Sequence, residues 1–262
     1  RAAAQALITR LQGRQLACQQ NRDQRDATLK AEKQAWEKEL DAWTHETDPY
    51  SIEISKSSSH MHPRQMLREL EKAMPKRAMV STDIGNICSV SNSYLRFDEP
   101  RSMFAAMSFG NCGYAFPVIC GAKLAAPDRP AIAYVGDGAW GISLNELLTC
   151  AREKIGVTVV LFNNGQWGAE KKNHVDFYSQ RYQGVELDNP SWAGVARAFG
   201  CEGITVDKLS DVGAALAQSV KNQSEGKTTV LEMMVTKELG DPFRRDALSK
   251  PVRFLDKYKD FT

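Results

Sequence analysis

The sequence predicts an α/β fold with a doubly wound, mostly parallel sheet, and three observations lead to that prediction. Short apolar runs alternate with segments of helical periodicity between residues 63 and 235. Two of these runs, residues 131–135 and 157–162, each end in a turn rich in glycine, aspartate or asparagine. Leucines recur at helical spacing between them, so this stretch predicts a strand–helix–strand unit with a right-handed crossover.

The first part of the chain predicts helix followed by a polar connector. Within residues 1–46, Trp36 and Trp43 recur with two leucines at helical spacing among charged side chains. We interpret the charges as a solvated face and the tryptophans as packing against another domain. Asp48-Pro49 and three consecutive serines mark the connector. The expected organisation is a helical tail with its connector at residues 1–59, a sheet domain at residues 60–238 and a C-terminal arm at residues 239–262.

The sheet domain is expected to alternate helices and strands. Pro63 suits the first turn of a helix, Met66 and Leu70 belong to its apolar face, and Pro75 ends it. The next expected elements are a strand at 78–81, a helix after residue 86, a strand at 103–107, a helix after residue 113, strands at 131–135 and 157–162 with a helix between them, a helix at 192–199, a strand at 203–206, a helix at 211–220 and a strand at 228–235.

Composition limits the classes of function. The chain has 262 residues, a net charge of +2 and 42% apolar residues, which allows a sizeable core. This balance indicates neither nucleic acid nor membrane as a partner, and no apolar run is long enough for a membrane span. Six scattered cysteines without CxxC spacing argue against a zinc site or a disulfide framework. We expect a cytoplasmic protein, and because the chain lacks an initial methionine we expect it to be part of a longer one.

Two turns carry the chemistry, Gly136-Asp137-Gly138 and Asn163-Asn164-Gly165. Because neighbouring parallel strands end at the same edge of a sheet, we expect both turns to meet at one ligand site. Asp137 offers a carboxylate and Asn164 an amide oxygen, while the glycines let the backbone approach a ligand closely. Oxygen ligands with a single charge suit Mg²⁺ that keeps phosphate oxygens as further ligands. The residues therefore predict a metal–diphosphate site.

The spacing of these turns resembles the signature of thiamine-diphosphate enzymes. Gly-Asp-Gly is followed, after twenty-four positions, by Asn-Asn, in a strand–turn–helix–strand context. The resemblance covers residues 60–235 and implies thiamine diphosphate and Mg²⁺ as cofactors. It implies that Asp137, Asn164 and the backbone carbonyl of Gln166 hold the metal. The cofactor contacts that it implies at the first turn are Gly136, Gly138 and Ala139. The alternative is a pair of unrelated turns.

A third turn, Asp83-Ile84-Gly85-Asn86, ends the first expected strand of the sheet. In acetolactate-synthase-like enzymes the matching turn touches the cofactor diphosphate. The resemblance implies a backbone contact from Gly85 and a side-chain hydrogen bond from Asn86. The alternative is an ordinary strand-end turn in which the aspartate caps a helix.

The segment at residues 110–117 resembles the one that follows the substrate-facing strand in the same enzymes, and it holds Asn111 and Cys112 as implied cofactor contacts. The family places an apolar residue, often Met, beneath the cofactor, and Cys112 falls on that position. Cysteine departs from the usual Met, Ile or Leu, but a thiol is a small apolar filler. A catalytic Cys112 is the less favoured alternative, because the cofactor already supplies the nucleophile.

Charged residues follow the Asn163-Asn164-Gly165 turn, and the resemblance implies that they lie beside the reacting end of the cofactor. The expected catalytic or substrate-binding residues are Glu170, Lys171, Lys172 and His174. Further basic candidates are Arg181, Arg244, Arg245 and Lys250, the last three on an arm expected to close. The alternative for each is an ordinary solvated charge.

Within the superfamily the chain looks closest to the sulfoacetaldehyde acetyltransferases. The stretches that carry this resemblance are residues 61–66, 110–117, 163–173 and 239–261. It implies a transferase of sulfonate (taurine) degradation that converts sulfoacetaldehyde and phosphate to acetyl phosphate and sulfite. It also implies a pyrimidine-binding domain, usually from a second subunit, that no segment here resembles. We therefore expect a homodimer or homotetramer, and a chain that is inactive on its own.

Two other classes of function are weighed against this interpretation. An acetolactate-synthase-type carboligase would act on 2-oxo acids and release carbon dioxide. A non-catalytic dimerisation module would keep the fold without the chemistry, which the intact pair of Asp137 and Asn164 argues against. A dinucleotide-dependent dehydrogenase is disfavoured, because the chain has no GxGxxG turn.

Overall fold

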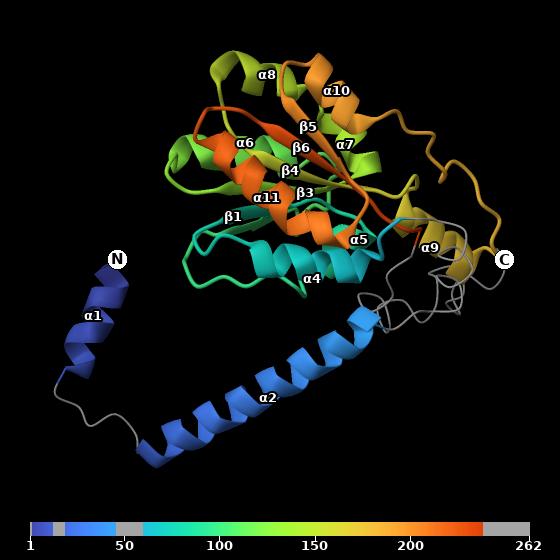
Figure 1. Cartoon of the computed structure of the whole chain (residues 1–262). Helices are drawn as coiled ribbons and strands as arrows, with labels where there is room; N and C mark the ends of the chain where they lie inside the picture. Colours follow the sequence, from blue (N-terminus) through green and yellow to red (C-terminus); the bar gives the residue numbers. More distant parts are fainter. Residues whose placement is uncertain (1, 13–18, 46–59, 238–262) are drawn as a thin grey trace, which may run out of the picture. The chain divides into compact units, whose positions relative to one another are not determined.

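The computed structural model describes residues 2–12, 19–45 and 60–237, and the chain divides into two units, residues 1–46 and 47–262. In the first unit, α1 spans Ala2–Leu11 and α2 spans Gln19–His45 (Figure 1). Helix was predicted throughout this unit, and its described residues form two helices.

Several predicted features lie outside the described residues. They include most of the connector, the arm at residues 239–262 and, on that arm, Arg244, Arg245 and Lys250. In the described part of the chain, no helix is both long enough and apolar enough to cross a membrane.

The second unit is built on a six-stranded sheet in which every neighbouring pair is parallel. The order across the sheet is β2-β1-β3-β4-β6-β5. The strands are β1 Met79–Thr82, β2 Met103–Ala105, β3 Ala131–Gly136, β4 Thr158–Asn163, β5 Glu202–Val206 and β6 Thr229–Met234. The predicted fold class is confirmed.

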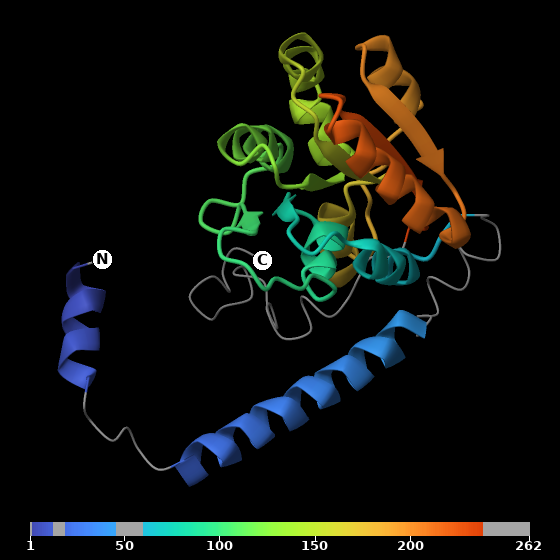
Figure 2. The ribbon, with the colours of Figure 1, turned by 60° about the vertical axis from the view of Figure 1, so that its left-hand side comes forward.

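Helices cover both faces of this sheet. They are α4 Pro63–Ala73, α5 Asn86–Ser91, α6 Ala115–Ala125, α7 Asp137–Ser143, α8 Glu146–Glu153, α9 Gly168–Phe177, α10 Trp192–Ala198 and α11 Leu209–Gln223. Ala133 and Val135 of β3 face a core formed with α6, α7, α8 and α10. Side chains alternate along a strand, so Ile132 and Tyr134 face the other layer, where α4, α5 and α11 pack. Figure 2 shows α6 in green on one side of the sheet, and α4 in cyan with α11 in orange-red on the other.

The segment after Gly138 differs from the prediction of a single helix. The structure has α7 and α8, separated at Leu144 and Asn145. The backbone N–H groups of Leu147 and Leu148 donate to carbonyls three residues earlier, so the chain is wound more tightly there than in an α-helix. The tighter winding changes the phase of the helix, and Leu148, one of the leucines at helical spacing, is 56% exposed.

The central unit of the sheet is formed as predicted. β3 pairs with β4 in parallel, with Val135 opposite Leu161 and Gly136 opposite Phe162. The turns that contain Asp137 and Asn164 therefore lie at the same edge of the sheet. Helix α9, which follows the second turn, was not predicted as a helix.

Candidate active site

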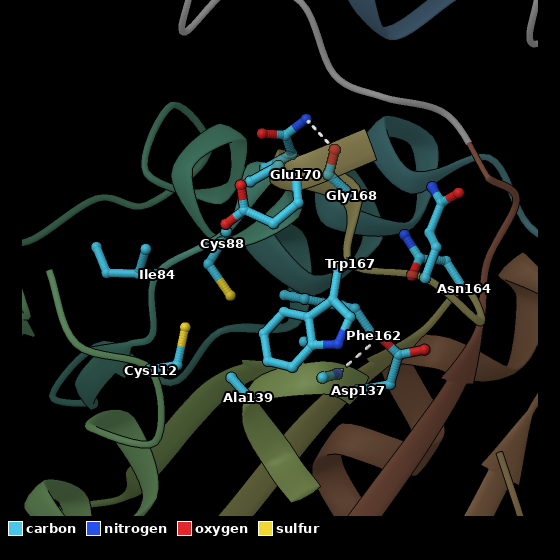
Figure 3. A pocket seen from close by; sticks show the side chains of 16 residues that line it. Ile84, Cys88, Cys112, Asp137, Ala139, Phe162, Asn164, Trp167, Gly168 and Glu170 are labelled. Atoms are coloured by element: carbon cyan, nitrogen blue, oxygen red, sulfur yellow. Dashed lines mark hydrogen bonds between the residues drawn. The ribbon is translucent and has the colours of Figure 1, made fainter. Parts of the chain in front are cut away.

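A pocket lies at the carboxyl edge of the sheet, where the chain leaves β1, β3 and β4 (Figure 3). β1 and β3 are neighbours, but β1 leads to β2 on one side and β3 leads to β4 on the other. This switch point is where doubly wound sheets open a crevice for ligands. The lining comes from the turns after the three strands and the helix starts that follow them, together with Cys88, Cys112 and Phe162. Figure 3 shows Asp137 and Asn164 at one end of the pocket, Cys112 at the other, and the indole of Trp167 between them.

Asp137 is a buried carboxylate whose two oxygens both accept hydrogen bonds. Its Oδ1 accepts the backbone N–H of Gly138 at 3.0 Å. Its Oδ2 accepts the backbone N–H of Gly165 at 2.7 Å and the side-chain amide of Asn189 at 2.8 Å. Burial raises the pKa of the Asp137 carboxyl, and these hydrogen bonds oppose the rise. Among the described residues, these hydrogen-bond donors, and no lysine or arginine, oppose the effect of burial on the pKa of Asp137. A nearby cation would stabilise this carboxylate.

Asn164 and Gln166 form the turn after β4, and both side chains are buried. An antiparallel bridge between Gln166 and Glu186 fixes this turn against the segment that follows α9. The Nε2 atom of Gln166 donates to the backbone carbonyl of Lys237 at 3.1 Å. Its Oε1 is buried and has no hydrogen-bond partner among the described residues. A buried oxygen without a partner is costly unless a donor or a cation reaches it.

Asp83, after β1, holds the segment that carries Cys112. Its Oδ1 accepts the backbone N–H of Gly113 at 3.0 Å, and its Oδ2 accepts that of Ala115 at 3.0 Å. Burial raises the pKa of the Asp83 carboxyl, while backbone hydrogen bonds, that from Ala115 foremost, lower it. Burial also raises the pKa of the Cys112 thiol, and the negative charges of Asp83 and Glu170 raise it further. Cys112 is therefore a thiol at neutral pH, in keeping with a filler and not a nucleophile.

Gly85 and Asn86 bring the β1 turn to the pocket. Gly85 has φ of +142°, which other residues adopt only with strain, so glycine is required by the backbone here. The side-chain Nδ2 of Asn86 donates to the backbone carbonyl of Gly168 at 3.3 Å. This hydrogen bond joins the β1 turn to the start of α9 across the pocket.

The charged residues of α9 divide between the pocket and its surroundings. Glu170 lines the pocket, and its Oε2 accepts from the amide of Asn173 at 3.1 Å. Lys171 is buried, forms an ion pair with Glu186 and lies 5.0 Å from the centre of the Tyr182 ring. Because Glu186 also pairs with Lys237, it bridges two lysines.

The other two charged candidates on α9 have local partners as well. Lys172 pairs with Asp176 at 2.5 Å, one helical turn further along. The His174 ring packs edge-on against Tyr178 and Tyr182, with centroid distances of 5.8 and 6.3 Å.

The structure brings most of the predicted site residues to this pocket. Those that line it are Gly85, Asn86, Cys112, Gly136, Asp137, Gly138, Ala139, Asn164, Gln166 and Glu170. Asn111, Lys171, Lys172 and His174 do not belong to its lining. Arg181 is exposed on the segment after α9, where its Nε donates to the backbone carbonyl of Tyr178.

Sequence reasoning missed three residues of the site. Trp167 lies two residues after the Asn163-Asn164-Gly165 turn, but nothing in the pattern places its ring in the pocket. Asn189 lies 52 residues after Asp137, and no spacing rule joins the two. Glu232 could have been found from the sequence, because it is the one charged residue in the apolar strand β6. A buried charge requires hydrogen-bond partners, so its position predicts a polar cluster there.

The residues present fit a metal ion with a diphosphate. The buried Asp137 carboxylate and the buried Asn164 amide at the same end of the pocket have oxygen atoms of the kind that would ligate such an ion. The unpartnered Oε1 of Gln166 shows that the same turn has acceptor capacity left over. Among the described residues, no group of three or more His, Cys, Asp or Glu could hold a metal ion alone. That scarcity suits a metal that takes further ligands from a bound phosphate.

Comparisons with known proteins agree with this geometry. The chain matches the family described as "Thiamine pyrophosphate enzyme, C-terminal TPP binding domain" over residues 83–233, more than half of its length. A sulfoacetaldehyde acetyltransferase of Castellaniella defragrans is 60% identical over the whole chain, which spans 45% of that relative. An acetolactate synthase of Mycobacterium bovis is 30% identical over 62% of the chain, corresponding to 27% of that protein.

Solved structures share the fold. The thiamine diphosphate-dependent 4-hydroxybenzoylformate decarboxylase of Rhodococcus jostii RHA1 superposes with a TM-score of 0.63 at 22% identity, covering 70% of this chain and 34% of that one. The sheet order, the pocket at the switch point of the sheet and the residues matched by the family model all point to the same family. The chain belongs to the thiamine pyrophosphate enzymes, and residues 83–233 form the C-terminal TPP-binding domain of that family.

Proposed function

We propose that the full-length protein is a thiamine-diphosphate-dependent sulfoacetaldehyde acetyltransferase, which converts sulfoacetaldehyde and phosphate to acetyl phosphate and sulfite. The observation that carries the proposal is the 60% identity with the Castellaniella relative of that name, along the whole of this chain. Identity with the acetolactate synthase is half as high. Because the chain spans 45% of the first relative, the activity is that of the whole protein, and this chain contributes its cofactor- and metal-binding part.

In this proposal Mg²⁺ is held by Asp137, Asn164 and the backbone carbonyl of Gln166. The buried carboxylate without a cationic partner and the oxygen-rich turn support the assignment. The proposed contacts with the cofactor are Gly85, Asn86, Asn111, Cys112, Gly136, Gly138 and Ala139. All of them except Asn111 line the pocket, and Asn111 directly precedes Cys112.

When bound, thiamine diphosphate supplies the carbon nucleophile and the electron sink that cleavage beside a carbonyl requires. The chain's own residues would shape the surroundings of that chemistry. Cys112, Ile84 and Phe162 give the pocket an apolar wall that excludes water. Glu170 is the proposed proton-moving group, and its Oε1 is the atom for that role because Oε2 accepts from Asn173.

Two anions, a sulfonate and a phosphate, must be bound in this reaction, and the proposed residues are Lys171, Lys172 and His174 on α9. Each lysine is already paired, Lys171 with Glu186 and Lys172 with Asp176. An anion would therefore bind by exchange with a carboxylate, which is easier at Lys172 because it is less buried.

The rest of the active site lies outside this chain in the proposal. We infer a cytoplasmic homodimer or homotetramer in which an N-terminal pyrimidine-binding domain, from a second subunit, completes the site. The 45% coverage of the Castellaniella relative supports a further domain.

An acetolactate-synthase-type carboligase is the second candidate, because the mycobacterial acetolactate synthase is 30% identical over 62% of the chain. Such an enzyme would release carbon dioxide from pyruvate and no sulfite. A third reading, a non-catalytic dimerisation module, has less support because both Asp137 and Asn164 are present and line the pocket.

The test uses the full-length protein with thiamine diphosphate, Mg²⁺, phosphate and sulfoacetaldehyde, and it follows sulfite and acetyl phosphate together. Equal release of both products, lost without phosphate and lost in Asp137→Asn, is the expected result. Carbon dioxide from pyruvate without sulfite would move the protein to the carboligases. Absence of thiamine diphosphate binding in the presence of Mg²⁺ would leave only the non-catalytic reading.

A further inference from the structure

The side-chain amide of Asn189 joins two parts of the site that the sequence keeps far apart. Its Nδ2 donates to Oδ2 of Asp137 at 2.8 Å and to Oδ1 of Asn163 at 3.0 Å. Asn189 lies on the segment between α9 and α10, while Asp137 begins α7 and Asn163 ends β4. One amide group thus spans the ends of two neighbouring strands.

The direction of these hydrogen bonds is fixed by Glu232. Its Oε1 accepts the Nδ2 of Asn163 at 2.9 Å and the backbone N–H of Trp192 at 3.0 Å, and its Oε2 accepts the backbone N–H of Ala193 at 3.1 Å. An N–H group only donates, so Glu232 presents oxygen to Asn163. Asn163 must then turn its own oxygen toward Asn189. Asn189 therefore has to present its NH₂ group both to Asn163 and to the Asp137 carboxylate.

Asn189 supplies the side-chain donor to the Asp137 carboxylate within the described part of the chain. Its other donors are backbone N–H groups, those of Gly138 and Gly165 among them, which every residue except proline would provide. Among the groups that hold the carboxylate plane, Asn189 is thus the one whose donor a substitution can remove. Partners that orient a metal-binding group change metal affinity by about 10–100-fold when they are removed.

We propose that Asn189 is a positioning residue that aims the Asp137 carboxylate at the metal ion, with its own direction set through Asn163 by Glu232. The inference rests on the proposed role of Asp137 as a metal ligand and adds a residue outside the metal-ligand set. Without Asn189, the carboxylate keeps backbone donors on both oxygens but loses the side-chain donor to Oδ2, so its orientation is held less tightly.

A purely structural role, in which Asn189 only anchors its segment, is opposed by other contacts of that segment. Leu187 donates its backbone N–H to Gly165 at 2.9 Å, and Trp167 donates its backbone N–H to Val185 at 2.8 Å. These bonds attach the segment to the metal turn without the Asn189 side chain. Removing that side chain is therefore expected to leave the fold intact.

The experiment measures Mg²⁺ binding directly. Mg²⁺ is titrated by calorimetry into metal-free full-length protein saturated with thiamine diphosphate, for wild type, Asn189→Ala and Asn189→Ser. The serine variant keeps one hydroxyl donor. Gln183→Ala is the matched control, since it removes an exposed amide from the same segment. Thermal unfolding of each metal-free protein is recorded beside the titration.

We expect Asn189→Ala to raise the Kd for Mg²⁺ about tenfold or more, Asn189→Ser to raise it less, and Gln183→Ala to stay within about twofold of wild type. All metal-free proteins should unfold cooperatively, and Asn189→Ala should melt lower only by the cost of two lost hydrogen bonds to buried oxygens. Wild-type binding with an unchanged Kd in Asn189→Ala would overturn the positioning role and leave the metal site standing. A drop in melting temperature beyond that cost, together with a weaker Kd that serine does not restore, would assign a structural role instead. A wild-type protein that binds no Mg²⁺ would overturn the metal site, and this inference with it.

Discussion

The indole ring of Trp167 lies flat against the backbone of Gly138. A Cβ atom added at Gly138 would lie 2.7 Å from Cδ2 of the indole and 2.8 Å from Cε2 and Cε3, distances that no packed carbon atoms tolerate. The second glycine of the Gly-Asp-Gly turn is therefore needed for a close approach between the turn after β3 and the turn after β4. Glycine at residue 138 keeps the turns after β3 and β4 in contact through Trp167.

Replacing Gly138 by alanine should destabilise the protein. Either the indole or the turn must move, and overpacking of this kind costs about 1–3 kcal/mol in the free energy of unfolding. Urea denaturation of the metal-free full-length protein measures the effect. Gly136→Ala is the matched control, because a Cβ there meets nothing within 4 Å. Equal destabilisation by both substitutions would show that the indole contact is not the cause.

The ion pair between Lys171 and Glu186 gives a prediction for the pH dependence of stability. Partial burial raises the pKa of Glu186, but hydrogen bonds and charges from Lys171 and Lys237 outweigh that rise, and the net pKa lies below its ordinary value of 4.5. A lowered carboxyl pKa means that the stabilisation is present above pH 4.5 and is lost as pH falls through the folded-state pKa.

Glu186→Gln should therefore lower the free energy of unfolding by about 1–2 kcal/mol at neutral pH, a reduced figure because Glu186 is 49% exposed. The difference from wild type should shrink as the pH is lowered below 4.5. Urea denaturation at several pH values measures it. Glu225→Gln, which removes a carboxylate from an exposed pair with Lys227, is the control and should change little. A difference that persists unchanged in acid would contradict the ion-pair origin.

The sequence was most informative where local patterns decide the structure. The alternation of apolar runs and helical segments predicted the strands to within about two residues, because each strand of a sheet covered on both faces must be apolar. The meeting of the Asp137 and Asn164 turns at one site was also predicted, since parallel neighbouring strands end at the same edge of the sheet. The split between α7 and α8 was missed, because Leu144 and Asn145 have no helix-breaking chemistry.

Sequence patterns could not predict hydrogen bonds and ion pairs between residues far apart in the chain. Asn189 reaches Asp137 from a segment without regular structure, and its direction depends on Glu232, which is far away in the chain. Lys171 was expected to face an anionic substrate, but its partner Glu186 lies 15 residues further on, and no periodicity joins them. Such pairs follow from how the turns fold back over the sheet edge.

The charges around Cys112 predict how fast its thiol reacts. Burial, then the Asp83 carboxylate and then Glu170 raise its pKa, so removing either charge should increase the thiolate fraction and the rate of alkylation at neutral pH. The expected order of rates is Asp83→Asn, then Glu170→Gln, then wild type, with Glu153→Gln as a remote exposed control. Glu170→Gln isolates the effect of charge, because Asp83→Asn also weakens the hydrogen bonds that hold the Cys112 segment. The pH profile of iodoacetamide labelling, mapped by mass spectrometry, measures the pKa. A profile that is the same in all four proteins would contradict the electrostatic argument.

Cofactor binding should protect Cys112 from the same reagent. Cys112 is half-buried and lines the pocket, whereas Cys88, which also lines it, is buried, as are Cys120, Cys150 and Cys201. Labelling of the full-length protein should therefore slow at Cys112 by about tenfold or more when thiamine diphosphate and Mg²⁺ are added together, because the bound group covers the open side of the thiol. Asp137→Asn, which weakens metal binding in the proposal, should lose most of this protection at the same cofactor concentration. Equal protection in wild type and Asp137→Asn would show that binding of the cofactor does not depend on Asp137 as a metal ligand. Binding of the cofactor with no protection at Cys112 would place it away from the end of the pocket where that thiol lies.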